Sequence, residues 1–119
     1  MILHIVPRAA WEAAQEAGVY EGDTLATQGF IHCSTEHQVH RPATALFRGR
    51  DDLLLLVLDE SRLPTPLTWE QGDPPDPEGN PFPHLYAPLP LDAVERVVEY
   101  RPRPDGTFAP PTKDGELEG

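Results

Sequence analysis

The sequence predicts a single α+β domain with two main helices, and three observations lead to this fold class. The chain has 119 residues, which is enough for one domain and too few for two. Short apolar runs typical of strands are interspersed with two helical patterns in the first half. Thirteen of the fifteen prolines lie at or after Pro64, so we expect the second half to consist mainly of loops.

The N-terminal segment predicts a strand followed by a helix. Ile2–Val6 is apolar and rich in β-branched residues, which is typical of a strand. Arg8–Ala17 contains five alanines and predicts a helix, with Trp11 as its large buried side chain. Gly18 ends this helix, and Tyr20–Gln28 reads as a polar loop.

The next segment predicts a short strand and then the second main helix. Phe30–Cys33 reads as the strand. Ser34 or Thr35 would cap the helix, since Thr35 and Gln38 have the spacing of a capping box. We expect this helix to run to residue 48, kinked or split by the proline at position 42, with the apolar residues 46 and 47 facing inward.

The second half predicts one buried strand and several short ones. Leu53–Leu58 is an unbroken apolar run, which favours a strand near the sheet centre. Leu67–Glu70, Leu85–Tyr86 and Glu95–Tyr100 follow as short strands. Gln71–Pro83 has no hydrophobic pattern and is a candidate flap over an active site. We expect residues 1–108 to form the domain and residues 109–119 to be a disordered acidic tail.

The composition restricts the classes of partner. A formal net charge of −11 argues against binding to nucleic acid or to anionic lipid, because both need a basic face. No stretch is long and apolar enough for a membrane span, and no signal peptide is recognisable. The single cysteine fits a reducing compartment. We therefore expect a cytoplasmic protein, a monomer or a weak dimer, whose partner is a small molecule or anion.

Three histidines are candidates for a functional site. His4 interrupts an apolar strand on the face of residues 2 and 6, and His32 shares a strand face with Phe30 and Ser34. His84 follows the long flap and shares a face with Tyr86. A buried imidazole needs hydrogen-bond partners, so satisfied structural histidines are the alternative interpretation.

Other polar residues could complete the site. The amides after Ser34 and Thr35 would form an anion pocket at a helix start, although simple capping explains both residues equally. Glu70 could stabilise a cation or act as a base, or it could be a solvated acid at a strand end. Trp69 could stack on a ligand ring or belong to the core.

A metal site is not predicted. His4, His32, Cys33 and His84 could supply nitrogen and sulfur ligands, but no pair has the close spacing of a zinc site. Cys33 lies in an apolar strand, where a buried thiol is inert, so it is not expected to be a nucleophile.

The order of these motifs resembles domain-of-unknown-function family 952 over roughly residues 2–100. The resemblance rests on these residues: Leu3-His4-Ile5, Trp11, Gly18, Tyr20, Gly29 to Thr35 with Gln38, Gly49, Asp52-Leu53, Trp69-Glu70, Phe82 to Tyr86, and Pro88-Leu89. The family has been grouped with the ADP-ribosyltransferase-like fold. That grouping implies a small split β-sheet and a cleft that binds NAD.

The resemblance also implies roles for individual residues. His4 would hydrogen-bond a ribose hydroxyl, and Ser34 with Thr35 would hold the diphosphate. Tyr20 or Tyr86 would stack on nicotinamide. Glu70 would stabilise the cationic ribosyl transition state, and His32 or Ser34 matches a second-strand position of the fold. The activity implied is ADP-ribosyl transfer or cleavage of the glycosidic bond of NAD. Two alternatives stay open: a binding module without catalysis, and an interaction domain with structural histidines.

Overall fold

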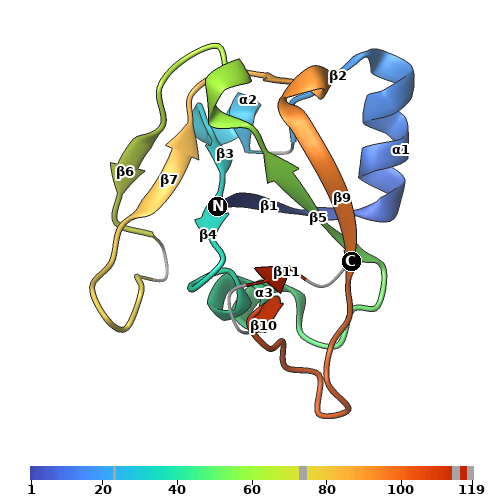
Figure 1. Cartoon of the computed structure of the whole chain (residues 1–119), viewed down its shortest axis with the longest axis vertical. Coiled ribbons are helices and arrows are strands. Elements are labelled where there is room, and N and C mark those ends of the chain that lie inside the picture. The colour runs from blue at the N-terminus through green and yellow to red at the C-terminus, as the bar shows by residue number, and fades with distance from the viewer. Residues whose placement is uncertain (23, 73–74, 114–115, 118–119) are drawn as a thin grey trace.

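The computed structural model describes residues 1–22, 24–72, 75–113 and 116–117 (Figure 1). The chain order of the elements is β1 (Ile2–Pro7), α1 (Arg8–Ala17), β2 (Val19–Tyr20), α2 (Leu25–Gln28), β3 (Ile31–His32), β4 (Ser34–Thr35), α3 (His40–Phe47), β5 (Leu53–Leu58), η1 (Glu60–Arg62), β6 (Thr68–Glu70), β7 (Phe82–Leu85), β8 (Leu89–Pro90), η2 (Leu91–Ala93), β9 (Val94–Tyr100), β10 (Thr112–Lys113) and β11 (Glu116–Leu117). The fold is therefore α+β, as the sequence predicts.

A four-stranded antiparallel sheet in the order β4-β1-β5-β9 forms the centre of the molecule. All six residues of β5 are buried, because apolar clusters cover both faces of this strand. Leu54 and Leu56 pack toward α1 and β3, whereas Leu53 and Leu55 pack toward α3. The unbroken apolar run is thus confirmed as a strand buried on both faces.

A second sheet has the order β3-β7-β6, and the chain passes directly from it into the first sheet. His32 on β3 pairs with His84 on β7, while Ser34 on β4 pairs with Leu3 on β1. Cys33 is the residue between them. Strand β4 pairs only with the first two residues of β1, Ile2 and Leu3. From His4 onward, that edge of β1 has no strand partner among the described residues.

Helix α1 begins and ends where the sequence predicts. Trp11 and Ala14 are buried against the sheet, and the remaining residues form the exposed face. Gly18 ends the helix with a φ of 84°, and its N–H donates to the carbonyl of Ala14. This left-handed conformation favours glycine, because a side chain would meet the following carbonyl.

Gly18→Ala is expected to lower the free energy of unfolding by roughly 1 kcal/mol, through backbone conformation alone. No atom lies within 4 Å of the position that a Cβ would occupy, so no clash adds to this cost. Urea unfolding measures the effect. Gly18→Asn is the matched control and should lose less stability, because asparagine visits the left-handed region more readily. Equal losses for both variants would contradict this explanation.

The second main helix begins later than the sequence predicts. Ser34 and Thr35 form β4, and α3 begins at His40. Pro42 explains the difference, since a proline is tolerated in the first turn of a helix but breaks a helix interior. The predicted capping box survives only as a turn, in which the Thr35 N–H donates to Gln38 Oε1 at 3.1 Å.

The inward face of α3 is also different from the expectation. Ala43 is buried and Phe47 packs against the core, but 63% of Leu46 is exposed. The prediction that Leu46 faces inward is therefore wrong. Leu46 lies three residues after Ala43, on the same side of the helix, but its side chain borders an open groove instead of packing on the sheet.

Two other segments contain more structure than expected. The predicted loop Tyr20–Gln28 includes the end of β2, which pairs with β8, and the whole of α2. Strand β7 begins at Phe82 rather than at residue 85, so the flap ends earlier. Pairings between residues far apart in the sequence, Tyr20 with Leu89 and Glu70 with Phe82, give these segments their conformation.

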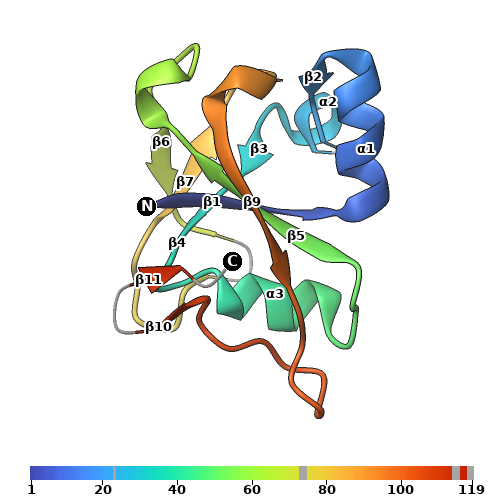
Figure 2. The same ribbon diagram turned by 45° about the vertical axis from the view of Figure 1, so that its right-hand side comes forward.

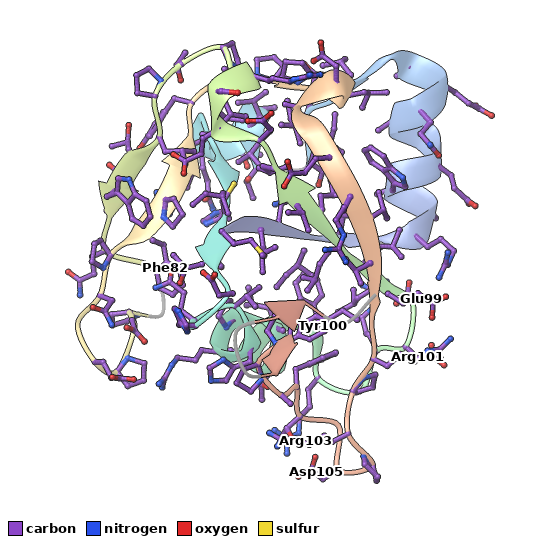
Figure 3. All side chains as sticks on the ribbon, in the orientation of Figure 1. Phe82, Glu99, Tyr100, Arg101, Arg103 and Asp105 are labelled. Carbon is purple, nitrogen blue, oxygen red and sulfur yellow. The ribbon has the colours of Figure 1, made fainter. Side chains whose placement is uncertain are left out.

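The chain after β9 folds back under α3. The hydroxyl of Tyr100 donates to the carbonyl of Ala109, and the ring of Tyr100 packs on Phe108. Arg103 and Asp105 lie at the tip of this loop, far from β7 (Figure 3). The disorder expected over residues 109–119 stays a prediction, because residues 114, 115, 118 and 119 lie outside the described part. Among the described residues of this segment, β10 pairs with β11. No helix in the described ranges is long and apolar enough to cross a membrane.

Candidate functional site

An open groove of about 960 Å³ runs along the unpaired side of β1. Residues of helix α1 and the loop after it line one side of the groove, and residues of α3 line another. Figure 2 shows the two helices on opposite sides of β1, with α1 above this strand and α3 below it. One end of the groove is apolar and is lined by alanines of α1 and by Pro42, Leu46 and Phe47 of α3. The other end is polar and is lined by His4, Tyr20, Gln28, His32, Ser34 and His84, among others.

His84 is the most distinctive residue of the polar end. It is 3% exposed, and its Nδ1 lies 2.7 Å from Glu70 Oε1. A carboxylate can only accept, so Nδ1 carries a proton, and in the neutral form of the ring Nε2 has a free lone pair. His84 Nε2 is buried and has no hydrogen-bond partner among the described residues. A buried polar atom of this kind usually has a ligand or a water as its partner.

The oxygen that holds His84 also accepts a second hydrogen bond. The hydroxyl of Tyr86 donates to Glu70 Oε1 at 2.7 Å. These three residues come from β6, β7 and the residue after β7, and the pairing of Thr68 with His84 brings them together. Glu70 and Tyr86 do not line the groove, so they act on a ligand only through the ring of His84.

Phe30 organises the rings around His84. Its ring stacks on His84 with a centroid distance of 4.2 Å and an interplanar angle of 19°. The ring of His32 meets His84 edge-on at 5.2 Å, and His32 Nε2 donates to Gln28 Oε1 at 2.7 Å. Sequence reasoning did not select Phe30 as a site residue. Its position two residues before His32, on the same strand face, was the signal that could have found it.

His4 connects the two sheets and β2. Its Nδ1 donates to the carbonyl of His32 at 2.5 Å, and its Nε2 lies 2.7 Å from the hydroxyl of Tyr20. Both ring nitrogens are therefore engaged within the protein. This arrangement favours the structural interpretation of His4, although the residue lines the groove.

The remaining predicted site residues lie at different places. Ser34 lines the groove, whereas Thr35 and Trp69 line a second cavity of about 340 Å³ on the other side of β6 and β7. Trp69 is 48% exposed there, so it is not a core residue. The structure thus brings His4, Tyr20, His32, Ser34 and His84 to one groove and places Thr35 and Trp69 elsewhere.

The predicted anion pocket after Ser34 and Thr35 is wrong. These residues form strand β4, and the next helix starts at His40, five residues beyond Thr35. Their amides therefore do not form a helix start, and no helix dipole is directed at this position. Pro42 is the physical reason, as described above.

Cys33 is buried, and its surroundings bear on both its reactivity and metal binding. Burial raises the pKa of the Cys33 thiol to about 12, which agrees with an inert cysteine. Within the ranges that the structure describes, no three histidine, cysteine, aspartate or glutamate side chains gather closely enough to hold a metal ion.

The Glu70 cluster gives a pH-dependent prediction. Hydrogen bonds from Tyr86 and then from His84 hold the pKa of the Glu70 carboxyl below its ordinary value. A carboxyl with a lower pKa in the folded state stabilises the fold above its unfolded pKa, and this contribution is lost as the pH falls through the folded pKa. We expect Glu70→Gln to be less stable than the wild type at neutral pH and the gap to shrink in acid. Urea unfolding over a pH series measures this gap.

Tyr86→Phe is the control for this pH series. It removes one of the two hydrogen bonds to Glu70 Oε1 and leaves the carboxylate and His84 in place. The variant should show a smaller pH-dependent loss than Glu70→Gln. A stability gap for Glu70→Gln that stays constant across the acid range would exclude a charged Glu70 as its source.

The fold and the groove together define a small α+β domain with a ligand-sized groove and a histidine–carboxylate pair. The chain belongs to the family described as "Protein of unknown function (DUF952)", whose model matches residues 5–97. This finding confirms the family resemblance drawn from the motifs. A search of the curated proteins finds no match.

The chain is also similar to solved structures of protein CC0527 from Caulobacter crescentus. The crystal structure is 35% identical, has a TM-score of 0.78, and the match covers 91% of this chain and 92% of that one. The solution NMR structure is also 35% identical, with a TM-score of 0.73 and 90% coverage of both chains. At this identity and coverage, the similarity extends over nearly the whole domain.

Proposed function

We propose that the groove binds a small organic molecule and that His84 acts on it as a general base. The observation that carries this proposal is the buried, unpartnered Nε2 of His84, a residue of the groove lining whose Nδ1 is held by Glu70. A base oriented by a carboxylate, in a groove that is mostly apolar, is the usual arrangement for proton abstraction.

The ligand class that we propose is a nucleotide, with NAD as the first candidate. Two considerations support it: the resemblance to ADP-ribosyltransferase-like proteins, and the passage of one chain segment between two sheets at Cys33, beside the groove. The proposed activity is ADP-ribosyl transfer or cleavage of the glycosidic bond of NAD. His32 and Ser34 line the groove. In this proposal they contact ribose hydroxyls.

The proposed step uses His84 to take a proton. Water or an acceptor hydroxyl attacks the ribose carbon and forms the new C–O bond, while its proton goes to His84 Nε2. The C–N bond breaks, and its electron pair goes to the pyridinium nitrogen, so that neutral nicotinamide leaves. Glu70 is a positioning residue in this scheme, because it stabilises the imidazolium through Nδ1.

A binding module without catalysis is the second candidate function. The absence of Glu70 from the groove lining favours it, since the carboxylate is then not in place to stabilise a ribosyl cation directly. The late start of α3 favours it too. Ser34 and Thr35 lie in a strand, so the helix start that was expected to hold a diphosphate is not at this position. Both candidates require His84 to contact the ligand.

Calorimetry with NAD and assays of nicotinamide release test the two candidates. His84→Gln is expected to slow release by about 10²-fold to 10⁴-fold, and Glu70→Gln by less. Val97→Ala, at the exposed edge of β9, is the control and should behave like the wild type. Binding without release by the wild type would support the binding module. Neither binding nor release would defeat the nucleotide proposal.

Assembly and location are part of the same proposal. We propose a monomer or a weak dimer in the reducing cytoplasm, because Cys33 is buried and no exposed cysteine is present in the described ranges. Sedimentation analysis at micromolar concentration checks the first point, and a stable dimer would contradict it.

A further inference from the structure

We propose that the part of the ligand that contacts His84 is an uncharged aromatic or heteroaromatic ring carrying an O–H or N–H group. This inference rests on the proposed function, because it assumes that the groove is a ligand site. It adds the chemical class of the group that meets the base. Three independent features lead to it: the protonation of His84, the rings around it, and the charges along the groove.

The first feature is the need for a donor. Glu70 Oε1 fixes the proton on Nδ1, so Nε2 of the neutral imidazole can only accept. Tyr86 donates to the same oxygen and thereby helps to keep the carboxylate charged. The ligand atom at Nε2 must therefore bring a hydrogen. An ether, a ketone or a purely apolar group would leave this buried acceptor unpaired.

The second feature is the flat surface beside the acceptor. The ring of Phe30 stacks on His84 at 4.2 Å and also lies 4.6 Å from the ring of His32, centroid to centroid. Phe30, His32 and Phe82 all line the groove next to His84. Aromatic rings favour offset or edge-on contacts with other rings, so a planar ligand gains more here than a branched aliphatic one.

The third feature is the lack of a free positive charge. Arg50 is the only arginine among the groove residues that the structure describes, and two hydrogen bonds of 2.9 and 2.6 Å tie its guanidinium to Asp52. Glu21 lines the same groove. With a formal net charge of −11 on the chain, an anionic group beside His84 is disfavoured. An uncharged donor fits these surroundings better than a phosphate or a carboxylate.

Three matched probes test the inference on the full chain by calorimetry. The probes are 4-nitrophenol, nitrobenzene, which lacks the hydroxyl, and 4-nitrobenzoate, which is charged. Near neutral pH, with the affinity expressed per protonated phenol, we expect 4-nitrophenol to bind at least about tenfold more tightly than the other two, the gain typical of one good hydrogen bond. His84→Phe keeps a ring but removes the acceptor, and should abolish this preference. Val97→Ala should retain it.

A second measurement uses only the wild type, so its result does not depend on whether His84→Phe folds. In a tautomer-sensitive ¹⁵N NMR spectrum, 4-nitrophenol should shift the Nε2 resonance of His84 and leave Nδ1 as the protonated nitrogen. Equal affinities for 4-nitrophenol and nitrobenzene, tighter binding of 4-nitrobenzoate, or an unmoved Nε2 resonance would each overturn the inference.

The outcomes separate this inference from the proposed function. If NAD binds in a His84-dependent manner but none of the three probes does, the nucleotide proposal stands and the ring inference fails. If 4-nitrophenol binds through His84 but NAD neither binds nor releases nicotinamide, the ring inference stands and the nucleotide proposal fails.

Discussion

Leu56→Ala is expected to lower the free energy of unfolding by about 2–5 kcal/mol, a large part of the stability of a domain of this size. Leu56 is fully buried at the centre of β5, between His4 on β1 and Val97 on β9. Neighbouring strands on both sides prevent the backbone from collapsing into the cavity that the truncation leaves. Urea unfolding followed by circular dichroism measures the loss.

Leu46→Ala is the matched control for this prediction. The same atoms are removed, but 63% of Leu46 is exposed, because its side chain borders the open groove. We expect a change within about 0.5 kcal/mol, as for most surface substitutions. A loss as large as that of Leu56→Ala would mean that residue 46 faces the core after all.

His4→Ala is expected to lower the free energy of unfolding by roughly 3 kcal/mol. The variant leaves the carbonyl of His32, in a part-buried hydrogen bond, and the hydroxyl of Tyr20, in a buried one, without this partner. The loss of a hydrogen-bond partner at a buried group costs about 1–3 kcal/mol. Thermal and urea unfolding measure the change. Such a loss would assign His4 to the scaffold of the groove.

Tyr20→Phe separates the two hydrogen bonds of His4. It removes the hydroxyl at 2.7 Å from Nε2 and keeps the ring contact, whose centroids are 5.0 Å apart. We expect a smaller loss than for His4→Ala. If His4→Ala is as stable as the wild type and instead weakens ligand binding, His4 belongs to the ligand-contacting residues.

The elements with a strong local signal could be predicted from the sequence. The run Leu53–Leu58 has no polar interruption, and Arg8–Ala17 is bounded by Pro7 and Gly18, so pattern and boundary signals agree. The start of α3 could not be predicted in the same way. Ser34 and Thr35 pair with β1 there, and Pro42 is tolerated only in the first turn of the helix, so the helix begins after the capping pattern of Thr35 and Gln38.

The candidate site was predictable in part. Strand alternation placed His84 and Tyr86 on one face, and both contact Glu70 in the structure. The separation of Thr35 and Trp69 from the groove could not be inferred, because it depends on where the chain crosses between sheets. The stacking of Phe30 on His84 depends on the register of β3 against β7, which no local pattern fixes.

The crossing at Cys33 makes the two sheets mechanically dependent on each other. Residues on either side of it are hydrogen-bonded into different sheets, and the imidazole of His4 fastens the first sheet to the carbonyl of His32 in the second. We therefore expect the two sheets to move together at this segment, and any widening of the groove to come from the helices that line it.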